Sequence, residues 1–496
     1  MSGFWNVVCL FAGTLAFCLG PQAVSRAQEA SAPVTVTFAA QANRHPVSGF
    51  GGEWDPHFWT ERNGRRGCDE AAWRALTDRI RGMGVSRVRT SVLPDWYEPE
   101  NDNADPAVTD GAAFTWDSEQ MLSLRRQLDF CQEAGIRVTL TWWCAPARIA
   151  GGRPYWLGFA GSKQWCSAPN DAAECAENIA AVLRHLVVDR GYSCIDAFTF
   201  MNEPDWTYLN DENRVDFGHY AEVCRAIHER LVREGLRDRL ELDLADDSSH
   251  RGWLQQTAGA LGGVSDRLNA HSYVFSCGDS GYAPAMRVWV RDRVAWSGAL
   301  PFSVNELGTR HVQGAYTATD IETFERGFCV AQFALLGLNE GMTGALFWGL
   351  HDQYYYDGNP EDGSNGGLMK TNLMAYADEG WRMRPAGEAW SLVCRAAPRG
   401  ARAHAGASDS PELDGVALVP PDGGGVNLLL VNRAAAARKV ALRGIPGGAV
   451  PLEKAEVSAF GRNGASGPET RVWTETTGLE LPPETFLLVR LSGPKK

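Results

Sequence analysis

The feature of this sequence that most constrains its fold is a long alternation of strand-like and helix-like segments through the middle of the chain. Short apolar runs that end in polar or aromatic residues are followed by longer stretches with apolar side chains at spacings of three and four. Trp73, Leu76, Ile80 and Met83 form one such stretch, and the spacing is typical of a helix with one buried face. Strands alternating with helices favour a parallel sheet.

Eight segments have the pattern of such a strand. They are Val47–Glu53, Ser86–Ser91, Arg137–Trp142, Ala197–Asn202, Leu240–Ala245, Arg267–His271, Phe302–Asn305 and Ala345–Trp348. Helical patterns between them include Met121 to Cys131 and Tyr220 to Leu231, and Gly84 stands where a helix would stop. Eight strand–helix units predict a closed α/β barrel, the (β/α)8 TIM barrel, over residues 47–390.

The pattern changes from about Ala396. Helical periodicity stops, and short β-rich runs separated by Gly and Pro follow, such as Val426–Val431 and Thr485–Leu491. We expect a C-terminal β-sandwich over residues 396–496. Val34–Phe38 has the same strand character, so we expect residues 33–40 to add a strand to this module.

The N-terminus has the pattern of an export signal. Phe4 to Leu19 is a short apolar run, and Ser25-Arg26-Ala27 fits the small-x-small rule for cleavage. We therefore expect residues 1–27 to be a signal peptide and the protein to be secreted or periplasmic. Lipid attachment at Cys18 is the alternative. No later segment is long and apolar enough to span a bilayer.

Composition narrows the classes of partner. The 496 residues carry a net charge of -13, which argues against nucleic acid because a basic face would be expected. The 18 Trp suit a carbohydrate substrate, since indole rings stack on apolar sugar faces. The spacing of the cysteines matches no zinc pattern. Cys166 and Cys175 flank a loop and form the best candidate for a disulfide. Oligomeric state is not visible in the sequence.

In barrel enzymes the catalytic groups lie at the carboxyl ends of the strands, so we examined those positions. Two glutamates stand out: Glu203 follows Asn202 at the end of the fourth strand, and Glu306 ends the seventh. Two carboxyl groups that flank a glycosidic bond can hydrolyse it, one as acid/base and the other as nucleophile. The two strand ends face each other across a barrel mouth, so we assign Glu203 as acid/base and Glu306 as nucleophile.

Other strand ends supply candidates for binding and orientation. Arg89 would keep Glu306 ionised, Tyr273 could hydrogen-bond it, and Asn202 would bind a sugar hydroxyl. Trp348 would form an apolar floor under the sugar. The remaining candidates are His271, Trp142, preferred over Trp143, and Glu53.

These motifs resemble those of glycoside hydrolase clan A. The stretches that carry the resemblance are FTFMNEPDW (198–206), FSVNELGTR (302–310), LNAHSYVF (268–275) and ALFWGL (345–350). In that clan the acid/base follows an Asn at the end of strand four and the nucleophile ends strand seven. The opening VSGFGGEWDPHFW (47–59) is similar to family 30, and the C-terminal part of the barrel is similar to family 39. The resemblance implies a retaining β-glycosidase that needs no cofactor or metal.

Several residues also have a purely structural reading. Arg89 could be a salt-bridge partner, His271 a satisfied buried histidine, and Glu53 a cap for the barrel. Asp246, Asp247 and His250 could suggest a metal site, but we expect a solvated loop there because no companion ligands stand out.

Three alternatives to glycoside hydrolysis stay open. The barrel could be a silent carbohydrate-binding protein, although both glutamates are present. A transglycosylase would pass the covalent glycosyl group to a sugar instead of water. An esterase is disfavoured because no G-x-S-x-G motif is present. The sugar, the linkage and endo or exo action are not apparent from the sequence.

Overall fold

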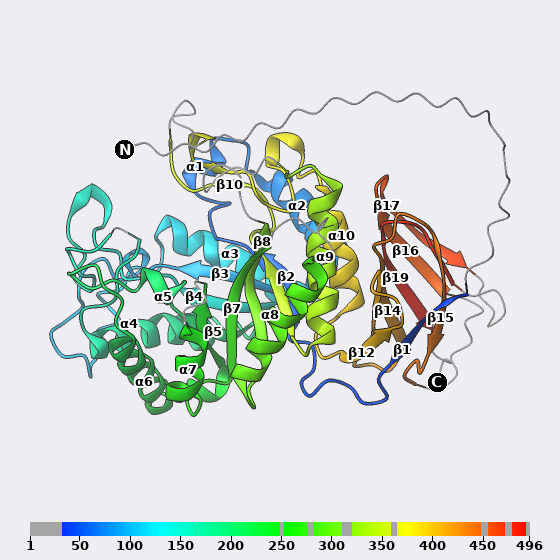
Figure 1. The fold of residues 1–496 in the computed structure, drawn as a ribbon. Helices are drawn as coiled ribbons and strands as arrows, with labels where there is room; N and C mark the ends of the chain where they lie inside the picture. The colour runs from blue at the N-terminus through cyan, green and yellow to red at the C-terminus, as the bar shows by residue number, and fades with distance from the viewer. Residues whose placement is uncertain are drawn as a thin grey trace, which may run out of the picture.

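The computed structural model describes residues 32–163, 165–248, 252–274, 281–309, 320–358, 365–447, 455–471 and 479–492. In this part of the chain, eight parallel strands close a barrel and nine further strands form a curled sheet beside it (Figure 1). The predicted fold class, a (β/α)8 barrel with a C-terminal β-sandwich, is confirmed. The predicted signal peptide, residues 1–27, lies outside the described residues. Among the described helices, none combines the length and the apolar character needed to cross a membrane.

The barrel strands follow one another in chain order around the barrel. They are β2 (Gly49–Glu53), β3 (Arg87–Val92), β4 (Arg137–Trp142), β5 (Ile195–Phe200), β6 (Glu241–Asp247), β7 (Arg267–Val274), β8 (Phe302–Thr309) and β9 (Gly344–Phe347). β9 pairs in parallel with β2, with Ala345 opposite Phe50, and this pairing closes the barrel. Each predicted strand corresponds to one of these, although several ends differ.

Helices connect the strands and surround the barrel (Figure 1). They are α1 (Glu61–Gly64), α2 (Glu70–Met83), α3 (Glu119–Ala134), α4 (Ala172–Leu183), α5 (Pro204–Thr207), α6 (Phe217–Arg233), α7 (Trp253–Leu261), α8 (Tyr282–Ser297), α9 (Phe324–Asn339) and α10 (Pro385–Ala396). α2 shows why the chain folds this way locally. The Asp69 side chain accepts hydrogen bonds from two N–H groups of its first turn, and Gly84 ends it with φ of 77°, a conformation that favours glycine.

The curled sheet contains strands from both ends of the chain. Its members are β1 (Val34–Phe38), β12 (Arg402–Ser408), β13 (Leu413–Val419), β14 (Gly425–Asn432), β15 (Arg438–Arg443), β16 (Ala455–Gly461), β17 (Gly464–Arg471), β18 (Leu479–Leu481) and β19 (Thr485–Ser492). β1 lies between β12 and β15, with Val36 opposite Ser408 on one side and Leu442 on the other. A separate pair, β10 (Gln353–Tyr354) and β11 (Leu368–Met369), follows the barrel.

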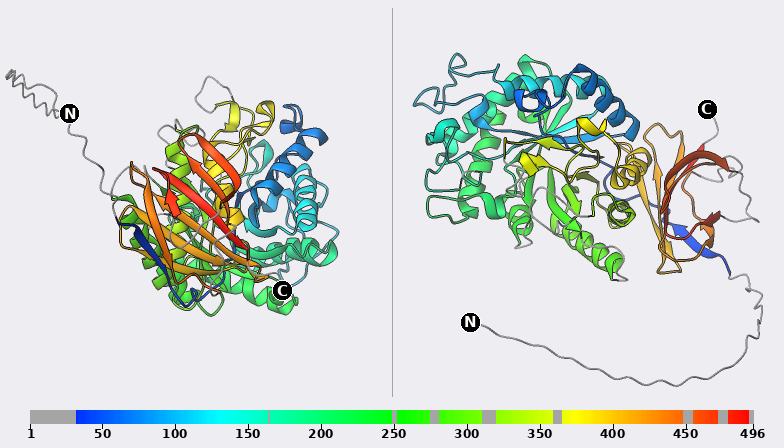
Figure 2. Two further views of the ribbon diagram at one scale, coloured as in Figure 1. Left: turned by 90° about the vertical axis from the view of Figure 1, so that its right-hand side faces the viewer. Right: turned by 90° about the horizontal axis from the view of Figure 1, so that it is seen from above.

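Part of the sheet is buried on both faces. On β14, Leu429 and Val431 belong to the apolar core that continues into the barrel, whereas Leu428 and Leu430 belong to the core inside the curled sheet. Successive side chains of a strand point to opposite faces, so this run of apolar residues fills two cores at once. α9 and α10 lie between the barrel and the sheet (Figures 1 and 2).

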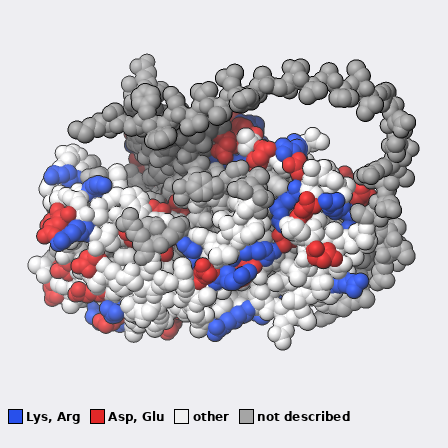
Figure 3. Space-filling view, viewed as in Figure 1, with Lys and Arg blue, Asp and Glu red and all other residues white. Residues whose placement is uncertain are grey.

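The distribution of surface charge and the predicted disulfide can both be compared with the structure. On the face drawn in Figure 3, acidic and basic side chains of the described residues are interspersed. Cys166 and Cys175 do not form the expected disulfide, because both are free thiols. Cys175 lies on α4 and is fully buried, with its side chain in the core instead of at the loop.

Candidate active site

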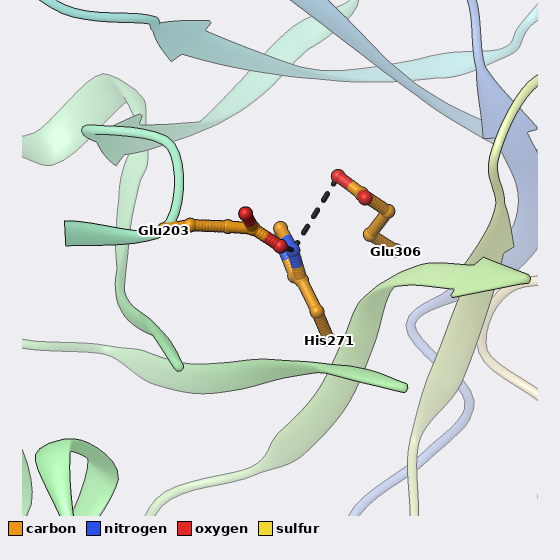
Figure 4. A group of neighbouring side chains, drawn as sticks. All are labelled: Glu203, His271 and Glu306. Carbon is orange, nitrogen blue, oxygen red and sulfur yellow. Dashed lines mark hydrogen bonds and ion pairs between the residues drawn. The ribbon is translucent and has the colours of Figure 1, made fainter. Parts of the chain in front are cut away.

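The two candidate catalytic carboxylates face each other across the mouth of the barrel. Glu203 directly follows the end of β5, and Glu306 lies on β8 (Figure 4). A carboxylate oxygen of each, together with a ring nitrogen of His271, lies within 4.8 Å of the others. The Glu203 side chain is 14% exposed and the Glu306 side chain 5%. The barrel thus brings together two carboxylates that are separated by about a hundred residues.

Local backbone geometry sets the direction of Glu203. This residue has φ of 46° and directly precedes α5, which begins with Pro204. The indole N–H of Trp206, on the first turn of α5, donates to Glu203 Oε2 over 2.7 Å. Glu203 is therefore held by its own following turn as well as by the barrel.

Glu306 is held from two sides. The Tyr273 hydroxyl, on β7, donates to Glu306 Oε1, and Arg89 NH1 lies 3.4 Å from Glu306 Oε2. Both predicted partners of Glu306 thus contact it. The Glu306 carboxylate, held by these two donors, lies opposite the Glu203 carboxylate (Figure 4).

Arg89 links most of the site. It is fully buried, and its guanidinium donates to Glu53 Oε2 over 3.0 Å, to Asn202 Oδ1 over 2.8 Å and to Asp246 Oδ2 over 2.8 Å. The position of Asn202 beside Glu203 is therefore fixed by a charged donor. The second oxygen of Glu53 is buried and has no hydrogen-bond partner among the described residues.

His271 lies between the carboxylates (Figure 4). Its Nδ1 is 2.9 Å from Glu203 Oε1 and 3.4 Å from Glu306 Oε2, and its Nε2 is 3.1 Å from Asp246 Oδ1. Burial lowers the pKa of His271, but the neighbouring Asp246 and Glu306 raise it more, so that its pKa lies well above the ordinary value. We therefore assign the imidazolium form to His271 in the free site.

The electrostatics of the carboxyl groups follow from burial. Burial and, to a smaller extent, the negative charge of Glu203 raise the pKa of Glu306 to about 7, although His271, Arg89 and Tyr273 act to lower it. Burial also raises the pKa of Glu53 well above its usual range. For Asp246 burial acts in the same direction, but Arg89 and His271 outweigh it and leave the pKa lowered. Among these carboxyl groups, Asp246 is therefore the one that stays ionised.

The expectation of a solvated loop at Asp246 was wrong. Asp246 lies on β6, is fully buried, and also accepts the backbone N–H of Glu203 over 3.3 Å. The register of β6 against β7 shifts between Leu244 and Asp247, and Ala245 and Asp246 have positive φ. A bulge of this kind re-aims a side chain, which the sequence pattern alone does not reveal. His250 lies outside the described residues.

The preference for Trp142 over Trp143 is also corrected. Trp142 is fully buried, and its indole N–H donates to Tyr97 and to Asn178 on α4, which places it on the outer side of β4. Trp143 instead lies 6.1 Å from Trp348 between ring centroids and 5.5 Å from the Arg89 guanidinium. The two side chains do point to opposite sides, as expected, but Trp143 and not Trp142 lies on the side of Arg89 and Trp348.

The group Glu203, His271 and Glu306 has the spacing of a metal site. The arrangement fits proton transfer and nucleophilic attack better, with one carboxylate opposite another and donors aimed at both.

Solved structures with this fold include several glycoside hydrolases. The catalytic domain of the GH30 xylanase C from Talaromyces cellulolyticus has a TM-score of 0.65 at 14% identity, over 92% of this chain and 100% of that one. An endo-β1,6-glucanase has 0.61 at 13%, over 94% and 96%. The GH51 α-L-arabinofuranosidase from Thermotoga petrophila has 0.61 at 12%, over 92% and 100%.

No protein-family model and no curated protein sequence matches this chain. At these identities the likeness concerns the fold, and it extends over nearly the whole length of both partners. The arrangement of barrel and curled sheet is thus one that enzymes of glycoside hydrolase clan A share.

Proposed function

We propose that this protein is a retaining glycoside hydrolase that cleaves O-glycosidic, most simply β, bonds in oligo- or polysaccharides. The observation that carries the proposal is the pair Glu203 and Glu306, with oxygens within 4.8 Å of each other. Retaining enzymes have carboxyl groups about 5–5.5 Å apart, and inverting enzymes need about 6.5–9.5 Å to admit a water. The short separation supports double displacement.

In the first step a Glu306 oxygen attacks the anomeric carbon, and the bond from that carbon to the leaving oxygen breaks. Glu203 gives its proton to the leaving oxygen, so that the leaving group departs as a neutral alcohol. His271 Nδ1, at 2.9 Å from Glu203 Oε1, holds the acid group in position for this transfer. The product of this step is a glycosyl ester on Glu306.

In the second step water replaces the ester. Glu203, now ionised, takes a proton from the water, whose oxygen attacks the anomeric carbon from the face that the leaving group occupied. Glu306 departs as a carboxylate, and the configuration is retained. Tyr273 and Arg89 support this step because they donate to the carboxylate that is released.

The remaining groups would position the sugar. Asn202 and the unpaired oxygen of Glu53 offer polar partners to hydroxyl groups, and both are fixed by Arg89. Trp143 and Trp348 lie next to each other and would provide apolar ring surface for stacking. No group of the curled sheet takes part, so we propose residues 47–390 as the catalytic unit and residues 396–496, with 33–40, as its support.

A trapping experiment tests the proposal. A panel of aryl β-glycosides identifies a substrate, and the matching 2-deoxy-2-fluoro glycoside should then label Glu306, as located by mass spectrometry. Glu306→Ala should lose activity on every substrate. Glu203→Ala should lose far more on poor leaving groups than on activated ones, by about 10²–10⁴-fold, and azide should restore turnover as a β-glycosyl azide.

Glu133→Gln is the matched control, because Glu133 is an exposed carboxylate on α3 paired only with Arg81, and it should behave like the wild type. Binding of sugars without turnover of any glycoside would favour a silent binding protein. A first product with inverted configuration would exclude the double displacement.

We also propose export of this protein, with cleavage after Ala27. The support is the apolar run Phe4 to Leu19 and the small residues that follow it. N-terminal sequencing of the exported protein checks this, and a mature terminus at a lipid-modified Cys18 would contradict it.

A further inference from the structure

A second group of carboxylates lies away from the proposed catalytic pair. Glu98 and Asp102 are on the segment that follows β3, and Glu177 is on α4. One oxygen from each side chain lies within 4.8 Å of the other two. Glu98 and Glu177 are fully buried, so this is not a chance gathering of exposed acidic groups.

Glu177 has no partner that accounts for its burial. Neither carboxylate oxygen has a hydrogen bond at ordinary distance among the described residues, and no ion pair reaches Glu177 in that part of the chain. A buried carboxylate left without donors costs several kcal/mol unless it is neutralised.

The nearest guanidinium is already engaged. Arg230 donates to Glu234, to the carbonyl oxygen of Pro106 and to the Thr109 hydroxyl. Glu98 keeps two neutral donors, the Asn178 side chain at 2.7 Å and the Asp102 backbone N–H at 3.2 Å. Three carboxylates therefore converge without a cation of their own.

We propose that Glu98, Asp102 and Glu177 bind a divalent cation of the calcium type. All three ligands are carboxylate oxygens, the donors that Ca²⁺ prefers, and no histidine or cysteine belongs to the set. Calcium takes about six to eight oxygens, so carbonyl groups of the adjoining segment and water would complete the shell. This site is independent of the glycosidase proposal and stands or falls separately.

The site would tie the segment after β3 to the outer side of the barrel. Asn178, the neighbour of Glu177 on α4, also accepts hydrogen bonds from the Tyr97 hydroxyl and from the Trp142 indole. A cation that binds Glu98 and Glu177 thus joins the segment to α4 and, through Asn178, to β4. Because it binds only the folded state, it raises the stability of the barrel.

Terbium luminescence tests the site without any use of enzyme activity. Tb³⁺ replaces Ca²⁺ in oxygen sites, and the side chains of Tyr155 and Trp156 both donate to the backbone carbonyl of Glu98, close enough to sensitise it. Tb³⁺ added to the metal-stripped full-length protein should give stoichiometric luminescence that Ca²⁺ displaces. Addition of Ca²⁺ should also raise the melting temperature.

Glu177→Gln keeps the size of the side chain and should lower the affinity for Tb³⁺ and Ca²⁺ by at least 10-fold and abolish the shift in melting temperature. Glu100→Gln is the matched control, since this exposed carboxylate of the same segment pairs with Arg153 instead, and it should bind like the wild type. The proposal would be overturned if the wild type gave no sensitised luminescence, or if Glu177→Gln bound Tb³⁺ and Ca²⁺ as tightly as the wild type. Circular dichroism of each variant shows that it is folded, and Glu98→Gln gives a second loss of binding if Glu177→Gln does not fold.

Discussion

Burial raises the pKa of Glu306 to about 7, although His271, Arg89 and the Tyr273 hydroxyl act in the opposite direction. Only the ionised carboxylate can attack carbon. As the pH falls through about 7, Glu306 takes up a proton and becomes inactive. We therefore expect kcat/KM to fall about 10-fold per pH unit on the acid side, with a midpoint near 7. Two pH profiles with an activated aryl glycoside measure this. The profile at low substrate concentration follows kcat/KM, and the profile at saturation follows kcat.

Tyr273→Phe provides the corresponding test of the group that holds Glu306. Loss of the hydroxyl removes a donor that favours the ionised form, so the acid midpoint should move to higher pH. A hydrogen bond to a charged group contributes about 1.5–3 kcal/mol, which corresponds to about 10- to 100-fold in kcat/KM. Tyr282→Phe is a suitable control, because this buried hydroxyl donates to the Cys329 carbonyl on α9. An unmoved midpoint in Tyr273→Phe would show that Tyr273 does not tune Glu306.

At the same scale, the sequence predicted the two carboxylates and most of their neighbours because each lies within or shortly after a strand with a clear pattern. Asp246 was not predicted, since a bulge in β6 turns it inward. Trp143 was passed over because alternation gives two opposite faces but does not say which one is the barrel mouth. The hydrogen bond from the Trp142 indole to Asn178 on α4 shows that Trp142 lies on the outer face. Such contacts between distant segments are not encoded in a local pattern.

The strand β1 is the element whose placement depends most on distant residues. Val36 is fully buried and contributes to the core inside the curled sheet. Val36→Ala should lower the free energy of unfolding by about 2 kcal/mol, because two methyl groups leave a cavity. Chemical denaturation measures this. Thr37→Ala on the exposed side of the same strand should change it by less than about 0.5 kcal/mol, and equal effects would mean that β1 is not packed as described.

Among the elements, strand and helix identities followed from periodicity, whereas the pairing of β1 did not. The strand character of Val34–Phe38 was apparent, but its insertion between β12 and β15 depends on strands far along the chain. Strand ends were also imprecise. β7 and β8 extend further than expected, and Tyr273 on β7 and Glu306 on β8 hydrogen-bond to each other inside the site.

At the scale of the whole molecule, the barrel and the curled sheet share an interface of aromatic and small residues. Phe460, on β16, is fully buried and stacks on Phe324 with ring centroids 5.3 Å apart. Phe460→Ala should lower stability by about 3–5 kcal/mol while KM stays unchanged, since the interface lies away from the strand ends. Thermal unfolding and steady-state kinetics measure the two effects. Glu480→Gln on the exposed side of β18 is the control, and a changed KM in Phe460→Ala would contradict the separation.

The position of β1 has a consequence for the order in which the molecule can be assembled. The Thr35 backbone N–H donates to the Asp409 side chain, 374 residues further along the chain. When a ribosome releases the chain from its N-terminus, the barrel strands are complete before either neighbour of β1 exists, because β12 begins at Arg402 and β15 at Arg438. The first strand must therefore wait, unpaired, through almost the whole of synthesis. Its docking is among the last events, and a chain that stops short of β12 leaves this apolar strand free to associate with other molecules.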